Sequence, residues 1–293
     1  GHVHLGKSSN HAFSIRKGET SLKIDITKDT AVIDPAFPPD MHPLFIEKRL
    51  LGLVYLANGK GPHKTLVLLH GFPGNEKNLD IAHMLRRGGI NVLIFHYSGA
   101  WGSRGTYSFG QAYRDLQAVR RAIADEAFAI EHRIDRENVY LAGHSVGGFL
   151  TLLAARDQMD FRGFAALAPY NLSYQASRFK DNRDERTAAL ELFSGGLPPL
   201  NGTTAESLLS EIIENGLEWD ILGGSTDYSD KKMLLVIASS DAVALPQVHQ
   251  VPIAEEMQRA GGAKTVVSLP CSHDFAECRV LLAKNLYDWL ESR

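Results

Sequence analysis

The sequence predicts an α/β fold: a mostly parallel central sheet with helices packed on both faces. Short aliphatic and β-branched segments alternate with longer segments of helical periodicity, and several short ones are apolar on both faces, as buried strands are. Of the 293 residues, 44% are hydrophobic and 22% are charged, which is typical of a globular protein with a sizeable core. Disordered, collagen-like and disulfide-dense scaffolds are therefore excluded.

The predicted elements follow one another in regular alternation. The strands span residues 50–56, 65–69, 91–95, 138–142, 163–168, 233–238 and 265–269, and the helices span residues 76–87, 109–129, 146–156, 252–260 and 276–291. Strands that alternate with helices form parallel sheets covered on both sides. Because the functional loops of such sheets gather at the carboxyl ends of the strands, we expect the site there.

Two segments depart from this alternation. Residues 1–40 are polar and weakly patterned, so we expect an N-terminal arm or edge element ahead of a domain of residues 41–293. Residues 171–230 contain no convincing strand and several glycine and proline turn signals. We expect two short amphipathic helices there, the second at 205–214 with a Thr203-x-x-Glu206 capping box, and interpret the segment as a small helical cap inserted between two strands.

The charge balance limits the partners. The chain carries 31 Lys and Arg against 34 Asp and Glu, a net charge of −3, with no basic block. Nucleic acid and anionic membrane surfaces are therefore excluded as main partners, and a small molecule or a peptide is expected. Since no apolar run approaches the ~18 residues of a membrane-spanning helix, we expect a soluble protein, either cytoplasmic or exported after loss of a signal peptide.

The strongest motif is Gly143-His144-Ser145-Val146-Gly147, which follows the apolar strand 138–142 and opens the helix 146–156. A G-x-S-x-G sequence between a strand and a helix is typical of a nucleophile elbow, a strained turn that exposes the serine oxygen. Side chains at positions 143 and 147 would collide with neighbours around this turn. We therefore expect Ser145 to be a catalytic nucleophile.

A serine nucleophile needs a base, and the base needs an orienting acid. After an elbow of this kind the acid and then the histidine follow the serine in the chain, and only His249 and His273 lie beyond Ser145. His273 follows the strand 265–269 in a short loop, whereas we expect His249 to be a surface residue. Asp241 follows the strand 233–238 and is the expected acid; Asp227, Asp230 and Asp274 are less well placed.

A tetrahedral intermediate also needs two N–H donors for its oxyanion. Val146, the residue after the nucleophile, is expected to supply one of them. Phe72, in the tight turn after the strand 65–69, is expected to supply the other, since Pro73 has no N–H. Tyr97 and Trp101 are aromatic residues on a neighbouring loop, for which substrate contact and plain packing remain open.

By these residues the chain resembles the α/β-hydrolase superfamily, over about residues 45–293. The runs HGFPGNEKNL (70–79) and FHYSGAWGS (95–103) are similar to those of bacterial esterase-like members close to the catalytic domain of the prolyl oligopeptidase family. The resemblance implies an α/β-hydrolase fold and the triad Ser145, Asp241 and His273. It departs at Pro246, which stands five residues after the acid instead of the usual four. Because the chain has no room for the β-propeller of the oligopeptidases, an esterase is favoured over a peptidase.

These observations predict a serine hydrolase, most simply a carboxylesterase, that cleaves small to medium esters through an acyl-enzyme and requires no cofactor. A peptidase or amidase with the same triad is the alternative for the enzyme, and a non-catalytic binding protein with the same fold is the alternative from another class. A dehalogenase would carry a carboxylate at the elbow, and a dienelactone hydrolase would carry a thiol there. Substrate identity and oligomeric state stay open.

Two further groups of residues could carry chemistry. His70, His96 and His144 each end a predicted strand, but histidines beside an elbow usually serve as hydrogen-bond partners, so we expect no metal site. Cys271 and Cys278 are favoured as two separate thiols, with a local disulfide as the alternative. If they pair, the bond closes across the loop that carries His273.

Overall fold

The computed structural model describes residues 24–30, 32–223 and 227–292, and these form one eight-stranded sheet in the order β1-β2-β4-β3-β5-β6-β7-β8. The strands are β1 (Asp40–Ile46), β2 (Leu50–Leu56), β3 (His63–Leu69), β4 (Asn91–Phe95), β5 (Ile134–His144), β6 (Phe164–Leu167), β7 (Met233–Ala238) and β8 (Lys264–Leu269). The strands from β4 to β8 in this order pair in parallel, while β2 pairs antiparallel with both β1 and β4. The predicted fold class is confirmed.

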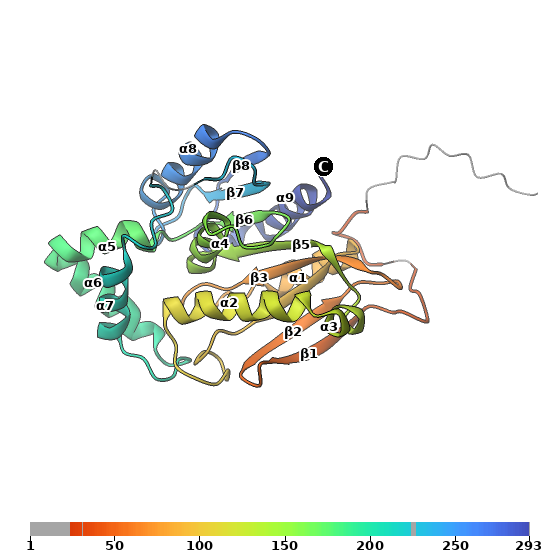
Figure 1. The fold of residues 1–293 in the computed structure, drawn as a ribbon. Helices are drawn as coiled ribbons and strands as arrows, with labels where there is room; N and C mark the ends of the chain where they lie inside the picture. The colour runs from red at the N-terminus through yellow and green to blue at the C-terminus, as the bar shows by residue number, and fades with distance from the viewer. Residues whose placement is uncertain (1–23, 31, 224–226, 293) are drawn as a thin grey trace, which may run out of the picture.

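The helices cover both faces of the sheet (Figure 1). They are α1 (Leu79–Arg87), α2 (Phe109–Ala124), α3 (Glu126–Glu131), α4 (Val146–Arg156), α5 (Leu172–Asp181), α6 (Arg183–Gly196), α7 (Ala205–Asn215), α8 (Val251–Ala260) and α9 (Arg279–Glu291), with short turns η1 (Pro246–Gln250) and η2 (Ala276–Cys278). Helices α1 and α9 pack on one face, and α2, α4 and α8 pack on the other. Alternate residues of β5 contribute to the two cores, Leu141 to one and Tyr140 to the other, as expected for a strand buried on both faces.

Strand β1 is an addition to the predicted elements. It pairs with β2 at the edge of the sheet, and its Leu44 and Ile46 side chains are buried. Pro43 within the strand is tolerated because an edge strand has unpaired N–H positions. Of the predicted N-terminal arm, residues 1–23 and 31 lie outside the described residues.

The single helix predicted over residues 109–129 is wrong, because the chain is interrupted at Asp125. This residue has extended backbone angles, and its carboxylate accepts a hydrogen bond from the N–H of Phe128 to start α3. The Thr203–Glu206 capping box is also wrong by one position. Thr204 caps α7, and Ser207 is its reciprocal partner.

Three helices, α5, α6 and α7, stand between β6 and β7, where the sequence predicted two. Asn182 separates α5 from α6: its side chain accepts hydrogen bonds from the N–H groups that start α6. This group of helices lies at the left of Figure 1, beyond the ends of the parallel strands.

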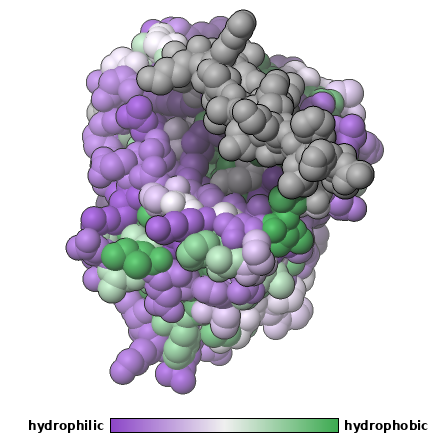
Figure 2. Space-filling view, turned by 90° about the vertical axis from the view of Figure 1, so that its right-hand side faces the viewer, coloured by the Kyte–Doolittle hydropathy of each residue, from purple (hydrophilic) through white to green (hydrophobic). Residues whose placement is uncertain are grey.

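The face of the molecule away from α5, α6 and α7 is mainly hydrophilic where it can be seen, with hydrophobic residues in separate spots (Figure 2). Among the residues described, none of the helices is long and apolar enough to cross a lipid bilayer.

Candidate functional site

The turn between β5 and α4 is the predicted elbow. Ser145 stands at its apex with φ 58° and ψ −120°, angles that residues other than glycine rarely adopt. The flanking glycines are required by space. A Cβ atom on Gly143 would lie 2.0 Å from the carbonyl oxygen of Gly147, and one on Gly147 would lie 2.7 Å from the carbonyl oxygens of Leu69 and His70. The local sequence thus forces the serine side chain out of the turn.

Ser145, His273 and Asp241 come together at the carboxyl ends of three strands, β5, β8 and β7. The serine Oγ lies 2.9 Å from Nε2 of His273, and Nδ1 of the same ring lies 2.6 Å from Oδ2 of Asp241. Ser145 and Asp241 are buried, and His273 is largely buried. With the proton on Nδ1, the ring donates to the carboxylate and its Nε2 is free to accept the serine proton.

The Asp241 carboxylate is held by the loop that follows it. Its Oδ1 accepts hydrogen bonds from the N–H groups of Val243 and Ala244, both at 2.8 Å, and its Oδ2 also accepts from the amide of Gln250 at 2.9 Å. The sequence did not single out Gln250, which is fully buried and lies nine residues along the chain. No motif marks such a residue, because its role depends on the turn η1 that carries it.

The other candidate aspartates face elsewhere. Asp274, next to the histidine in sequence, accepts hydrogen bonds from Ser272 Oγ and from the N–H of Ala276. Asp227 accepts from Ser229, and Asp230 pairs with Lys231 at the surface. The structure therefore brings only Asp241 of these four carboxylates to the imidazole.

The loop after β3 passes directly over the serine. A Cβ atom on Gly71 would lie 2.9 Å from Cβ of Ser145, so only glycine fits there. Val146 begins α4, and its N–H lies in the first turn, where helix N–H groups have no acceptor within the helix. Phe72, Val146, Ser145 and His273 all line one cavity of about 430 Å³.

This cavity is walled mainly by apolar side chains, which are those of Phe72, Val146, Leu172, Leu192, Phe193 and Val243. Tyr97 and Trp101 support the loop after β3. The Tyr97 hydroxyl donates to the carbonyl of His70, and Nε1 of Trp101 donates to the carbonyl of Pro73. A structural role therefore accounts for both rings.

The three histidines considered as metal ligands, one within the elbow and two after β3 and β4, are largely buried neutral rings. Burial lowers the pKa of His70 to about 3 and the pKa values of His96 and His144 to about 4. His144 donates from Nε2 to the carbonyl oxygen of His273 at 2.7 Å, which holds the loop of the base against the elbow. Within the described ranges, no three His, Cys, Asp or Glu side chains are grouped so that they could hold a metal ion.

The prediction of His249 as a surface residue is wrong, since its exposed fraction is 2%. The ring stacks on Tyr170 with centroids 4.4 Å apart, and its Nδ1 accepts a hydrogen bond from the N–H of Asn171 at 3.0 Å. Burial lowers the pKa of His249 to about 4. The start of α5 covers this histidine, and no pattern around position 249 could reveal that contact.

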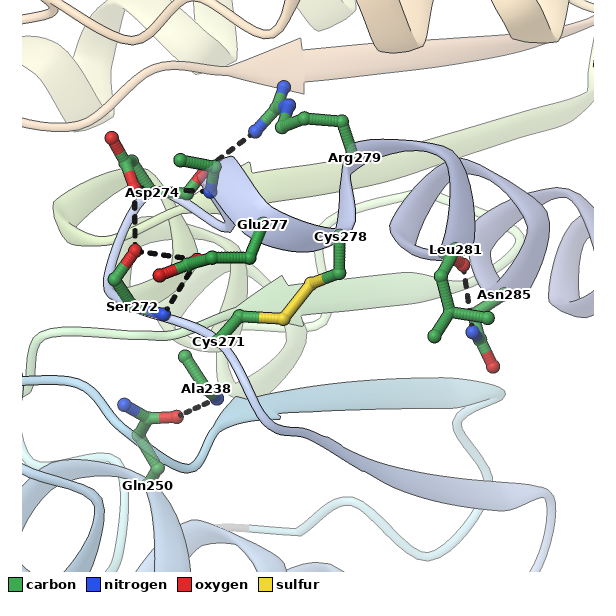
Figure 3. The surroundings of a disulfide bond; sticks show 11 residues. Ala238, Gln250, Cys271, Ser272, Asp274, Glu277, Cys278, Arg279, Leu281 and Asn285 are labelled. Atoms are coloured by element: carbon green, nitrogen blue, oxygen red, sulfur yellow. Dashed lines mark hydrogen bonds between the residues drawn. A yellow bond between two sulfur atoms is a disulfide. The ribbon is translucent and has the colours of Figure 1, made fainter.

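Cys271 and Cys278 form a disulfide, so the expectation of two separate thiols is wrong (Figure 3). The bond joins the two ends of the loop that carries His273. The same loop is tied to the loop of the acid, because the N–H of Ser240 donates to the carbonyl of Cys271 at 3.0 Å. The two spaced cysteines were a visible signal, but their spacing alone could not decide between pairing and separation.

Comparisons with known proteins agree with this architecture. The similar solved structures include the alpha/beta hydrolase GrgF from Penicillium sp. sh18 (22% identity, TM-score 0.60, 87% of this chain and 98% of that one). They also include the esterase Pf2001 of Pyrococcus furiosus (18%, TM-score 0.59, 89% and 96%) and a monoacylglycerol lipase of Paleococcus ferrophilus (16%, TM-score 0.56, 82% and 98%). No curated protein sequence matches the chain.

These structural similarities, all at low identity, concern the fold. The sequence itself matches the family model described as "Alpha/beta hydrolase family" over residues 66–283, a range that includes β3, the elbow and the loops of Asp241 and His273. The closer resemblance to the prolyl oligopeptidase type stays a prediction. Because the match spans most of its length, the chain belongs to the alpha/beta hydrolase family.

Proposed function

We propose that the protein is a serine hydrolase, a carboxylesterase that cleaves esters of small to medium size through an acyl-enzyme intermediate. The observation that carries the proposal is the unbroken chain of contacts from Ser145 Oγ through the His273 ring to the Asp241 carboxylate, at 2.9 and 2.6 Å. A serine hydroxyl is a weak nucleophile at neutral pH, and a base with this geometry can take its proton as it attacks.

The reaction proceeds in two stages. Ser145 Oγ attacks the ester carbonyl while His273 takes the serine proton; the resulting imidazolium is stabilised by Asp241 and then protonates the departing alcohol. Water, deprotonated by His273, next attacks the acyl-enzyme, and the serine recovers its proton as the acid leaves. The chemistry needs no cofactor.

The N–H groups of Phe72 and Val146 are the proposed donors to the oxyanion. Both residues border the cavity that holds Ser145. Donors fixed by the backbone stabilise the charge of the tetrahedral intermediate without having to reorient during the reaction.

The lining of the cavity supports an ester substrate. Its walls are mainly apolar, so a neutral acyl or alcohol group can be buried beside the serine. Two of the structurally similar proteins, an esterase and a monoacylglycerol lipase, agree with this substrate class. We further propose that α5, α6 and α7, in the insertion at residues 171–230, act as a cap on the domain of residues 41–293, because the end of α6 borders the cavity.

The test is hydrolysis of p-nitrophenyl acetate and labelling by a fluorophosphonate probe, which reacts with activated serines. Ser145→Ala should lower kcat at least about a thousandfold and abolish labelling. Ser210→Ala, which alters an exposed serine on α7, is the matched control and should behave as the wild type. Full turnover by Ser145→Ala would refute the proposal, and turnover of aminoacyl-nitroanilides without turnover of esters would favour the peptidase.

A further inference from the structure

A second cavity, of about 360 Å³, adjoins the one that holds Ser145. Tyr170, Leu192 and Val243 line both cavities. The two cavities therefore lie next to each other and share these three side chains as a common wall. A molecule whose reacting carbonyl lies at the serine can reach the second cavity by extending past these side chains.

The second cavity is lined by both apolar and polar side chains, and the lining carries no net charge. Its walls include Phe179, Ala189, Leu245 and Val248 together with the rings of Tyr170 and Tyr174. The two charged side chains that line it, Arg178 and Glu185, neutralise each other through a hydrogen bond of 3.0 Å from Nε to Oε1. His249 also lines it, and burial lowers the pKa of this ring to about 4, so that it carries no charge at neutral pH.

Large apolar side chains are exposed at the rim of this cavity. Leu192, Val243 and Leu245 are each about half exposed, at 50%, 50% and 51%, and Tyr174 is 38% exposed. All four line the second cavity. Single exposed apolar residues are ordinary, but a contiguous group around a concavity marks a surface that binds an apolar ligand.

We propose that the second cavity binds the apolar end of a substrate whose ester group lies at Ser145. The substrate class is an ester that bears a long alkyl or an aryl group on one side, long enough to pass the wall of Tyr170, Leu192 and Val243. This inference rests on the proposed function, which it makes more specific. Apolar area buried in the second cavity adds to transition-state binding and so raises kcat/KM for long esters over short ones.

The test compares two series of esters on purified protein, below their critical micelle concentrations. One series lengthens the acyl group, from p-nitrophenyl acetate to decanoate, and the other lengthens the alcohol, from ethyl to octyl acetate. In the wild type, kcat/KM should rise in one series by up to about fourfold per methylene group that enters the second cavity. The series that responds tells whether the cavity receives the acyl or the alcohol group.

Ala188→Trp fills the second cavity from α6, since Ala188 lines this cavity and does not line the cavity of Ser145. It should lower the ratio of kcat/KM for the longest ester to that for the shortest by at least about tenfold. Leu245→Trp, at an exposed rim position, tests the same cavity from another segment. Thr187→Trp is the matched control on the neighbouring exposed position of α6, and its ratio should equal that of the wild type.

The outcomes separate the two proposals. If no ester is hydrolysed in a serine-dependent way, the proposed function fails, and the inference fails with it. If acetate esters are hydrolysed by Ser145 but both tryptophan variants, shown by circular dichroism to be folded, keep the wild-type ratio, only the second cavity is refuted. A drop in the ratio for Ala188→Trp and Leu245→Trp, without one for Thr187→Trp, supports it.

Discussion

The amide nitrogen of Gln250 donates to Oδ2 of Asp241 at 2.9 Å, the same oxygen that lies 2.6 Å from Nδ1 of His273. The Gln250 side chain makes two further bonds: its Nε2 donates to the carbonyl of Ala244, and its Oε1 accepts from the N–H of Ala238 at 3.0 Å (Figure 3). A fully buried amide thus connects the end of β7, the carboxylate and the loop after it.

The first prediction concerns Gln250→Glu, which keeps the shape and adds an acid beside Asp241. Two buried carboxylates in contact hold one proton well above the usual carboxyl pKa, and as long as they do, the new acid can donate to Asp241 as the amide did. Because the folded-state pKa is raised, stability and kcat should match the wild type best at low pH and fall progressively as pH rises through that pKa. The measurement is kcat and the free energy of unfolding in urea, each from about pH 5 to about pH 9.

Gln247→Glu is the control for that experiment, because Gln247 is exposed on the same turn. It makes the same charge change and should keep the wild-type pH profile. A Gln250→Glu profile parallel to that of Gln247→Glu would contradict a link between Gln250 and the acid.

The second prediction concerns the Cys271–Cys278 disulfide. Replacing both cysteines with serine removes no member of the triad but frees the loop of eight residues that carries His273, and closing such a loop is worth about 2.5 kcal/mol by chain entropy. We expect a lower Tm and a kcat reduced by about threefold to thirtyfold with little change in KM, since the loop positions His273. Thiol titration, calorimetry and ester kinetics before and after treatment with a reductant check this.

The double serine variant also serves as the control for the reductant, to which it should not respond. A wild-type protein whose thiols appear on reduction while Tm and kcat stay constant would show that the bond is irrelevant to the base.

The third prediction follows from the buried neutral histidines. The pKa of His249 and that of His144 are lowered to about 4 by burial, below the value near 6.5 in the unfolded chain. The unfolded state therefore binds more protons below about pH 6.5, and stability should fall by a few kcal/mol between about pH 6.5 and pH 4. Urea unfolding over this range measures the slope.

His249→Gln should make that slope shallower, because it removes one of the two buried rings whose pKa is lowered. Equal slopes for the wild type and His249→Gln would mean that position 249 titrates normally.

The fourth prediction uses two adjacent glycines at the end of α6. A Cβ atom on Gly196 would lie 2.4 Å from Cε1 of Phe72, while one on Gly195 would meet nothing within 4 Å. Gly196→Ala should therefore push the Phe72 ring aside and, with it, shift the backbone that carries the proposed oxyanion N–H. We expect kcat for p-nitrophenyl acetate to fall by about tenfold or more. Gly195→Ala should lose far less, and a similar loss in both variants would argue against Phe72.

The local sequence was sufficient for the parts of the protein that depend on neighbours in the chain. The predicted strands 50–56, 91–95 and 233–238 and the helix 146–156 have the bounds that the structure gives them. The strand 233–238, for example, is a continuous apolar run, because all of its residues are buried in the middle of the sheet. The serine, the acid and the histidine each follow a strand of the sheet, in this order along the chain. Ser145, Asp241 and His273 could therefore be predicted as candidate site residues from their places after strands.

Contacts between distant segments were beyond the sequence. His249 is covered by α5, Gln250 reaches Asp241 through a single turn, and the wall between the two cavities joins residues of three separate segments. Periodicity describes which face of an element is apolar, but not which other element covers it. The sequence by itself determined the fold class and the residues at the strand ends, and the tertiary structure decided which side chains surround them, since burial and hydrogen bonding arise only when those segments pack together.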